Sequence, residues 1–178
     1  MGKRRGFAVW LTGLPASGKS TLAVALAEEL AKLGVDVQIL DSDDLRKWLT
    51  PQPTYSREER DWFYGAMVRI GRLLIENGVN VIFAATANKS RHRELARREL
   101  GKFMEVYLKC PLEVCLSRDD KEVYAKALTG EATTVPGLQE PYEPSASPEV
   151  TVETDKMSPG ECAQRIVERM KELSFLAT

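Results

Sequence analysis

The chain has 178 residues, of which 29% are charged, and its formal net charge at pH 7 is -1. This length suits one α/β domain and is too short for two ordinary ones, so we expect residues 1–178 to form a single domain. The small net charge argues against nucleic acid or an anionic membrane as a partner, and the lack of a long uncharged apolar run argues against a membrane-spanning helix.

The first part of the chain alternates between strand-like and helical patterns. Residues 7–11 are a short apolar run that predicts a strand, and the early break at Pro15 argues against a signal peptide despite the basic residues before it. After a glycine-rich loop, leucines recur at helical spacing until Gly34 stops the helix. Residues 35–40 predict a second strand, which ends in the acidic residues 41–44.

The middle of the chain continues this alternation. Residues 56–59 have the pattern of a capping box, and apolar residues at helical spacing follow until the Asn-Gly pair at 77–78. Residues 79–84 predict the third strand and residues 91–100 a further helix. Residues 103–108 predict the fourth strand.

The last part of the chain contains one segment without regular patterning. Residues 114–118 and 123–128 predict two short helices. Residues 129–148 are rich in glycine and proline and lack apolar periodicity, so we expect a long functional loop that acts as a mobile lid. Residues 150–152 predict a last strand, and residues 158–161 are a second capping box before the final helix.

The alternation of strands and helices predicts the fold class. It indicates an α/β fold with three layers, in which a parallel sheet of about five strands has helices on both faces. Ligands of such sheets bind beyond the carboxyl ends of the strands. Gly13, Asp41 and Thr86 follow the first three predicted strands, so we expect them at one edge of the sheet.

Residues 13–20 match the phosphate-loop motif G-x-x-x-x-G-K-[ST] in full. The glycines let successive backbone N–H groups turn toward phosphate oxygens, and the helix that follows adds its positive N-terminal end. Lys19 supplies a mobile positive charge and Ser20 a hydroxyl for Mg2+, as in the P-loop NTPase fold. We therefore expect ATP and Mg2+ as cofactors, with the nucleotide bound by Gly13, Leu14, Pro15, Ala16, Ser17, Gly18, Lys19, Ser20 and Thr21.

The remaining patterns favour a small-molecule kinase among the P-loop proteins. A GTPase would carry an acid after its Asn-Lys pair, but Ser90 and Arg91 follow the pair at 88–89. The third strand ends without an acid, so Asp41 or Asp43 must supply the carboxylate for the metal or for the acceptor hydroxyl. The alternative for this acidic cluster is a solvated turn and helix cap.

Cysteine and histidine usage argues against other chemistries. The three cysteines, Cys110, Cys115 and Cys162, are an odd number without metal-site spacing, so we expect reduced thiols in the core of a cytoplasmic protein. His92 is the only histidine, which argues against a histidine-based metal site or triad.

Five stretches of the sequence resemble one family, the adenylylsulfate kinases, which use ATP to phosphorylate the 3'-hydroxyl of adenosine 5'-phosphosulfate (APS). The most specific are Leu-Asp-Ser-Asp-Asp-Leu-Arg at residues 40–46 and Pro-Tyr-Glu-Pro at 141–144. The others are residues 10–21, 105–115 and 118–124. Together they cover most of the chain between residues 7 and 157.

The resemblance implies the reaction, the partners and the roles of particular residues. The substrate would be APS, the assembly a homodimer, and Lys19 a catalytic group. Asp41 and Asp43 would lie near the acceptor hydroxyl and the metal, which Ser20 and Asp41 would hold, and one of the two aspartates would be the general base. Arg46 would bind the phosphosulfate. Lys121 and the loop through Gly137 would close over both nucleotides.

The sequence departs from the family pattern at three places. Thr86 stands where the family has a serine described as a phosphorylated intermediate, and we expect Thr86 to line the pocket. Phe63 and Ala66 replace polar residues of the second helix, so Arg60, one turn away, is the candidate to bind the acceptor in their place. Val135 replaces a phenylalanine that stacks on adenine. Two alternatives follow: a related kinase of another small hydroxyl compound, and a nucleotide-binding regulatory domain.

Two further groups of side chains have open interpretations. The arginines at 91, 93, 97 and 98 favour a solvated helix face, with Arg93 as the candidate to reach an anionic group of the acceptor. The aromatic residues Trp48, Trp62, Phe63 and Tyr64 favour core or interface packing over stacking on an adenine.

Overall fold

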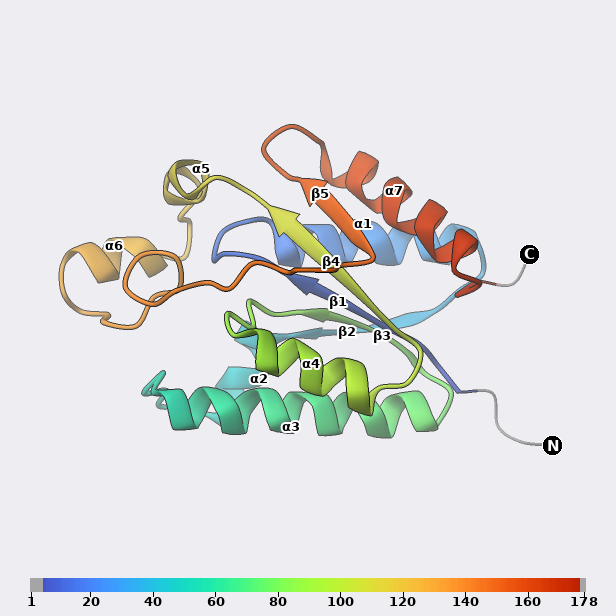
Figure 1. The fold of residues 1–178 in the computed structure, drawn as a ribbon, viewed down its shortest axis with the longest axis horizontal. Helices are drawn as coiled ribbons and strands as arrows, with labels where there is room; N and C mark the ends of the chain where they lie inside the picture. The colour runs from blue at the N-terminus through green and yellow to red at the C-terminus, as the bar shows by residue number, and fades with distance from the viewer. Residues whose placement is uncertain (1–4, 177–178) are drawn as a thin grey trace.

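A computed structural model describes residues 5–176, so the basic residues Lys3 and Arg4 lie outside the described part. Its centre is a five-stranded, fully parallel sheet in the order β2-β3-β1-β4-β5 (Figure 1). The strands are β1 (Ala8–Thr12), β2 (Val37–Asp41), β3 (Asn80–Ala84), β4 (Phe103–Lys109) and β5 (Val150–Glu153). The five predicted strands and the predicted α/β class are confirmed.

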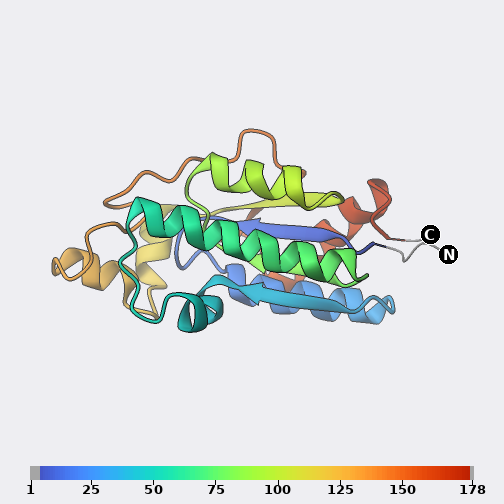
Figure 2. The ribbon, with the colours of Figure 1, turned by 90° about the horizontal axis from the view of Figure 1, so that it is seen from below.

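Helices cover both faces of the sheet, and two short helices lie beyond its carboxyl edge (Figures 1 and 2). One face carries α1 (Lys19–Lys32) and α7 (Pro159–Glu172), and the other carries α2 (Ser42–Leu49), α3 (Arg57–Glu76) and α4 (Ser90–Glu99). The two short helices are α5 (Leu112–Ser117) and α6 (Val123–Leu128). Helix α2 was not among the predicted elements, although a helix cap was one of the roles considered for the acidic residues at its start.

The burial pattern explains why the fold has three layers, with helices on both faces of the sheet. All five residues of β1 are buried, as expected for a central parallel strand covered on both faces. On the α3 side, the Trp10 and Phe83 rings stack with centroids 4.8 Å apart. Helix α3 approaches this pair at Gly71, where a Cβ atom would lie 2.2 Å from the Phe83 ring. A glycine is therefore required there for close packing.

Two serines begin helices as the capping patterns predict, but in different ways. Ser158 and Glu161 form a complete, reciprocal capping box at the start of α7. The Ser56 side chain accepts a hydrogen bond from Glu59 N at the start of α3. The Glu59 carboxylate, however, binds Arg46 and Thr54 instead of closing a second box.

A third cluster of buried residues joins α5, α6 and the late loop to the end of the sheet. Cys110, Cys115, Tyr124 and Val135 pack together there, and the Tyr124 hydroxyl donates a hydrogen bond to Pro15 O in the phosphate loop at 2.9 Å. All three cysteines are buried free thiols. Within residues 5–176, no helix is long and apolar enough to cross a membrane.

Candidate active site

The phosphate loop connects the end of β1 to the start of α1. Two residues have left-handed backbone conformations, Ala16 with a φ of 59° and Gly18 with a φ of 97°. Helix α1 begins directly after Gly18, so its free N–H groups face the loop. A Cβ atom at Gly13 would lie 2.7 Å from Leu108 O, so only glycine fits beside β4. These features match what a bound polyphosphate needs.

Lys19 folds back into the phosphate loop. Its Nζ atom donates hydrogen bonds to Gly13 O at 3.1 Å and to Leu14 O at 2.7 Å. Burial lowers the pKa of Lys19 to about 8, although the charges of Asp43 and Asp41 oppose this shift. The ammonium group thus lacks the negative charge that a phosphate would bring to it.

We predict that the affinity for ATP falls as the pH rises above about 8. Below this pKa the Lys19 ammonium is charged and attracts the phosphates; above it the free protein must first take up a proton. The dissociation constant for ATP, measured by titration calorimetry, should rise roughly tenfold between about pH 7.5 and about pH 9.5. The Lys19→Met variant should bind weakly and with no such pH dependence; a flat profile for the parent protein would contradict the role of this group.

The strand register brings the predicted acid to the phosphate loop. Leu11, Ala84 and Asp41 are partners across β1, β3 and β2, so Asp41 ends its strand level with the start of the loop. The Ser20 hydroxyl donates a hydrogen bond to Asp41 Oδ2 at 2.5 Å, while Asp41 Oδ1 accepts one from Asp43 N and caps α2. Asp41 therefore has both of the roles considered for it, as a helix cap and as a partner of the phosphate loop.

Asp43 contacts the segment between α5 and α6. Its Oδ2 atom forms a 2.5 Å ion pair with Lys121 Nζ, and both side chains are more than half exposed. Lys121 lies between α5 and α6, so this ion pair connects the lid region to the acidic cluster. The structure thus places Lys19, Ser20, Asp41, Asp43 and Lys121 in one continuous group.

The two arginines predicted to bind the acceptor lie side by side around one tyrosine. Arg46 is buried; it pairs with Glu59 Oε1 at 2.9 Å and stacks on Phe63 at 3.9 Å and on Tyr55 at 4.7 Å. Arg60 lies over the other part of this cluster, 5.4 Å from the Tyr55 ring. Phe63, which departs from the family pattern, therefore serves as a platform for Arg46.

Arg60 carries a charge that no carboxylate pairs with among the residues the structure describes. Its guanidinium donates hydrogen bonds to two backbone carbonyls, Tyr55 O at 3.1 Å and Thr134 O at 2.8 Å. Burial lowers its pKa, and the neighbouring Arg46 charge acts in the same direction. A half-buried cation of this kind attracts an anion, and its bond to Thr134 places the lid against α3.

Tyr55 is a candidate that the sequence analysis missed. Its side chain is 40% exposed, and its backbone has a φ of 54°, which L-residues rarely adopt. A half-exposed ring beside two guanidinium groups suits a planar, anionic ligand. The only signal in the sequence is its position directly before the capping Ser56. Of the aromatic residues considered, Phe63 and Tyr64 are buried in the core, while Trp48 and Trp62 are exposed.

Thr86 and Gly137 both lie close to the start of the phosphate loop. Thr86 follows β3, and its backbone oxygen accepts a 2.6 Å hydrogen bond from the hydroxyl of Thr12, which precedes Gly13. Gly137 has a φ of 88°, and a Cβ atom there would lie 2.5 Å from Leu14 Cδ2. The lid backbone therefore rests directly on the phosphate loop.

The interpretation of Arg93 as part of a solvated helix face is wrong. The Arg93 side chain is buried and forms a 3.0 Å ion pair with Glu105, which is also buried. It also donates hydrogen bonds to Ala87 O at 2.5 Å and Glu143 O at 2.7 Å. Both terminal nitrogens are bonded to these carbonyl oxygens, and the charge is paired with Glu105, so Arg93 is a structural link between α4, β4 and the late loop.

A cavity of about 510 Å3 lies beside the phosphate loop, on the side of α7, and the sequence analysis did not identify it. Thr154 Oγ1 donates a hydrogen bond to Ser17 O at 2.8 Å, and Arg118 donates one to Thr154 O at 2.9 Å. The cavity opens next to the phosphate loop. Its lining includes Gly18, Thr21, Arg118, Thr154, Met157 and Ser158. These segments are far apart in the sequence, which is why no local pattern reveals the cavity.

Comparisons with known proteins agree with this geometry. The family model for adenylylsulphate kinase matches residues 5–153. A Pyrococcus abyssi protein named "probable adenylyl-sulfate kinase" is 43% identical over 96% of this chain and 98% of its own length. The adenylyl-sulfate kinase of Rippkaea orientalis is 37% identical over 98% of this chain and 97% of its own.

One solved structure is also similar to this chain in its fold. The Mycobacterium tuberculosis APS kinase CysC, in complex with AMPPNP and APS, superimposes with a TM-score of 0.88 at 33% sequence identity. The match covers 94% of this chain and 98% of that one. The fold that carries the site described above is therefore that of a kinase solved with both a nucleotide analogue and APS.

Proposed function

This chain belongs to the adenylylsulphate kinase family, and on that premise we infer that it transfers the γ-phosphate of ATP to the 3'-hydroxyl of APS. It is an ATP-dependent kinase, and its products are ADP and 3'-phosphoadenylyl sulfate. The observation that carries the assignment to particular residues is the continuous group from Lys19 through Ser20, Asp41 and Asp43 to Lys121. It joins a phosphate-binding loop to an acid-lined acceptor side.

On the donor side, residues 13–21 bind the phosphates of ATP. The N–H groups at the start of α1 and the Lys19 ammonium neutralise charge on the β- and γ-phosphates. The cavity beside Thr154 and Arg118 takes the adenine. The volume of the cavity, about 510 Å3, and its position against Gly18 and Thr21 of the phosphate loop support this division.

The residues present also fit Mg2+. This ion prefers hard oxygen ligands and keeps several positions for water and substrate phosphates. Ser20 and Asp41 provide one hydroxyl and one carboxylate, already in contact with each other, and they would hold the ion. Bound there, Mg2+ would supply positive charge toward the transferred phosphoryl group.

On the acceptor side, Arg60 and Arg46 bind the phosphosulfate and Tyr55 stacks on the adenine of APS. The Arg46–Glu59 pair and the carbonyl bonds of Arg60 hold both guanidinium groups in place before the substrate arrives. Lys121 and the loop through Gly137 close over the two nucleotides. Thr86 lines the pocket without forming a covalent intermediate.

The transfer itself is a direct, in-line displacement. The 3'-oxygen of APS forms a bond to the γ-phosphorus, the bond from that phosphorus to the bridging β–γ oxygen breaks, and ADP leaves with its electron pair. The Asp43 carboxylate accepts the proton from the 3'-hydroxyl as the general base. The catalytic work of the protein is positioning and the neutralisation of charge by Lys19, to which Mg2+ held by Ser20 and Asp41 would add positive charge.

We expect the purified protein to release ADP from ATP in a coupled assay that depends on both Mg2+ and APS. Release at the background rate with APS would reject this acceptor. A panel of other nucleotides, sugars and sugar acids separates the second candidate, a kinase of another small hydroxyl compound. The buried, apolar Phe63 and the small Ala66 are the features that favour that candidate, because they change the surface that α3 presents to the acceptor pocket.

We also propose that the protein is a cytoplasmic homodimer. The free, buried cysteines support a reducing compartment. Trp48 and Trp62 support an interface between copies, because their side chains are 84% and 55% exposed and apolar rings of this size are usually covered. Light scattering on the eluted protein measures the assembly directly, and the mass of a single chain would contradict the dimer.

A further inference from the structure

The second part of the late loop, residues 129–148, is bonded to the body of the protein. Glu143 N donates a hydrogen bond to Asn88 O at 2.8 Å, and Asn88 Nδ2 donates one to Pro141 O at 3.2 Å. The Glu143 carboxylate accepts a bond from Ser90 N at 2.7 Å, and its backbone oxygen accepts one from Arg93. Residues 141–143 are thus pinned to the segment that follows β3. We call them the strap.

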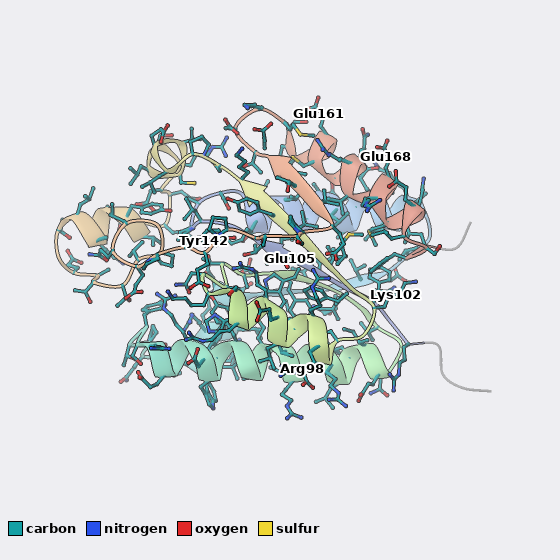
Figure 3. All side chains as sticks on the ribbon, in the orientation of Figure 1. Arg98, Lys102, Glu105, Tyr142, Glu161 and Glu168 are labelled. Carbon is teal, nitrogen blue, oxygen red and sulfur yellow. The ribbon has the colours of Figure 1, made fainter. Side chains whose placement is uncertain are left out.

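Tyr142, which is labelled in Figure 3, adds a connection from the strap to β1. Its hydroxyl lies 2.9 Å from Thr12 Oγ1, and Thr12 Oγ1 lies 2.6 Å from Thr86 O. A carbonyl oxygen only accepts, so Thr12 gives its single proton to Thr86 and the Tyr142 hydroxyl is the donor to Thr12. One short chain therefore joins the strap, the residue before Gly13 and the candidate pocket residue Thr86.

The Tyr142 ring is held on two sides. It stacks on Tyr107 with ring centroids 6.0 Å apart, and the Arg93 guanidinium lies 5.6 Å from its centre. Burial raises the pKa of Tyr142, so the hydroxyl keeps its proton at neutral pH. Farther along the loop, Ser145 donates a hydrogen bond to Glu105, which Figure 3 shows in the middle of the molecule.

The segment before the strap is attached differently. The turn between Val135 and Glu140 is closed by its own hydrogen bonds. It contacts the body at Leu14 through Gly137, and at α6 through the buried Val135 and the bond from Gln139 Nε2 to Ala127 O. A hollow of about 500 Å3 lies beside the contact between Gly137 and Leu14, and Tyr107 and Tyr142 also line it. The expected mobile loop, residues 129–148, therefore has two attachments: the strap pins its second part, and Val135 and Gly137 seat its first part.

We propose that Tyr142 is a positioning residue: through Thr12 it fixes the acceptor-side lid relative to the phosphate loop and Thr86. The proposal rests on the proposed function, because it assigns the lid to the acceptor. In this role Tyr142 acts through the backbone that leads from it to Gly137 and Thr134, and Thr134 O accepts a hydrogen bond from Arg60. The hydroxyl, and not the ring alone, is the group that acts.

The test is the Tyr142→Phe variant, which keeps the ring and loses one hydrogen bond. We expect kcat/KM for the acceptor to fall about tenfold. The dissociation constant for ATP, measured by calorimetry without acceptor, should stay within about twofold of the parent. Tyr107→Phe is the matched control, because the Tyr107 hydroxyl has no hydrogen bond to another residue in 5–176. An acceptor kcat/KM within about twofold of the parent, an equal loss in the control, or a parallel loss of ATP affinity would each overturn the proposal.

A second set of variants tests the route through Thr12. Thr12→Val removes the partner of Tyr142, whereas Thr12→Ser keeps a hydroxyl and should restore parental kinetics. Combining Thr12→Val with Tyr142→Phe should cost no more than Thr12→Val alone; additive losses would overturn the route. The parent's own rate with APS tests the proposed function separately. If the parent uses another acceptor, the same ratios are measured with that compound.

Discussion

Replacing Lys19 by methionine is expected to lower kcat about a thousandfold. Lys19 is the only full positive charge within the loop of residues 13–20, and it already lies against Gly13 O and Leu14 O. Methionine keeps the length of the aliphatic chain and removes the charge that would meet the β- and γ-phosphates. Steady-state ADP release with both substrates saturating measures the effect.

The fold should be unaffected by this change. Burial disfavours the charged form of Lys19 in the empty protein, as its lowered pKa indicates, so the charge is not what stabilises the loop. The thermal midpoint of Lys19→Met should therefore equal or exceed that of the parent. Lys32→Met is the control on the same helix, since Lys32 pairs only with Glu29 at the surface. A parental rate in Lys19→Met would contradict the assignment of the phosphate loop.

Replacing Asp43 by asparagine is expected to lower kcat by about a hundredfold or more, because the amide cannot take the proton from the acceptor hydroxyl. Asparagine keeps the size of the side chain and its place in the first turn of α2. The loss should appear in kcat and leave the dissociation constant for ATP within a few-fold of the parent. Single-turnover measurements with preformed complex separate this chemical step from product release.

Asp44 offers a matched control for the aspartate. It is the next residue of α2, it is exposed, and it pairs with Lys47 at 2.6 Å away from the phosphate loop. Asp44→Asn should keep the parental rate, since surface ion pairs contribute little to stability. If Asp43→Asn retained a rate within threefold of the parent, Asp43 would not be the base, and Asp41 would be the remaining candidate.

Features that depend on residues close together in the sequence were predictable. The phosphate-loop motif consists of eight consecutive residues, and its glycines and Lys19 directly indicate phosphate binding. The five strands follow from apolar runs. Ser158 and Glu161, which are three residues apart, predict the start of α7. Even the meeting of Ser20 and Asp41 follows from the general rule that parallel strands end at one edge.

Features that depend on distant partners were not predictable. Arg93 reads as one of four surface arginines because nothing nearby in the sequence shows that Glu105 is buried opposite it. Glu59 fits a capping box, yet Arg46, which is thirteen positions away, draws its carboxylate elsewhere. The cavity beside Thr154 combines residues from both ends of the chain. For Arg93 and Glu59 a distant partner overrides what the local sequence pattern predicts, and for the cavity no local pattern exists.

The two oxygens of Asp41 serve different neighbours: one meets Ser20 in the donor site, and the other caps the helix that carries Asp43 and Arg46. A ligand that changes the bonding of one oxygen alters the hold of the other on α2. Donor and acceptor are then linked through a single carboxylate. By thermodynamic reciprocity, whatever factor ATP imposes on the affinity for the acceptor, the acceptor imposes equally on the affinity for ATP.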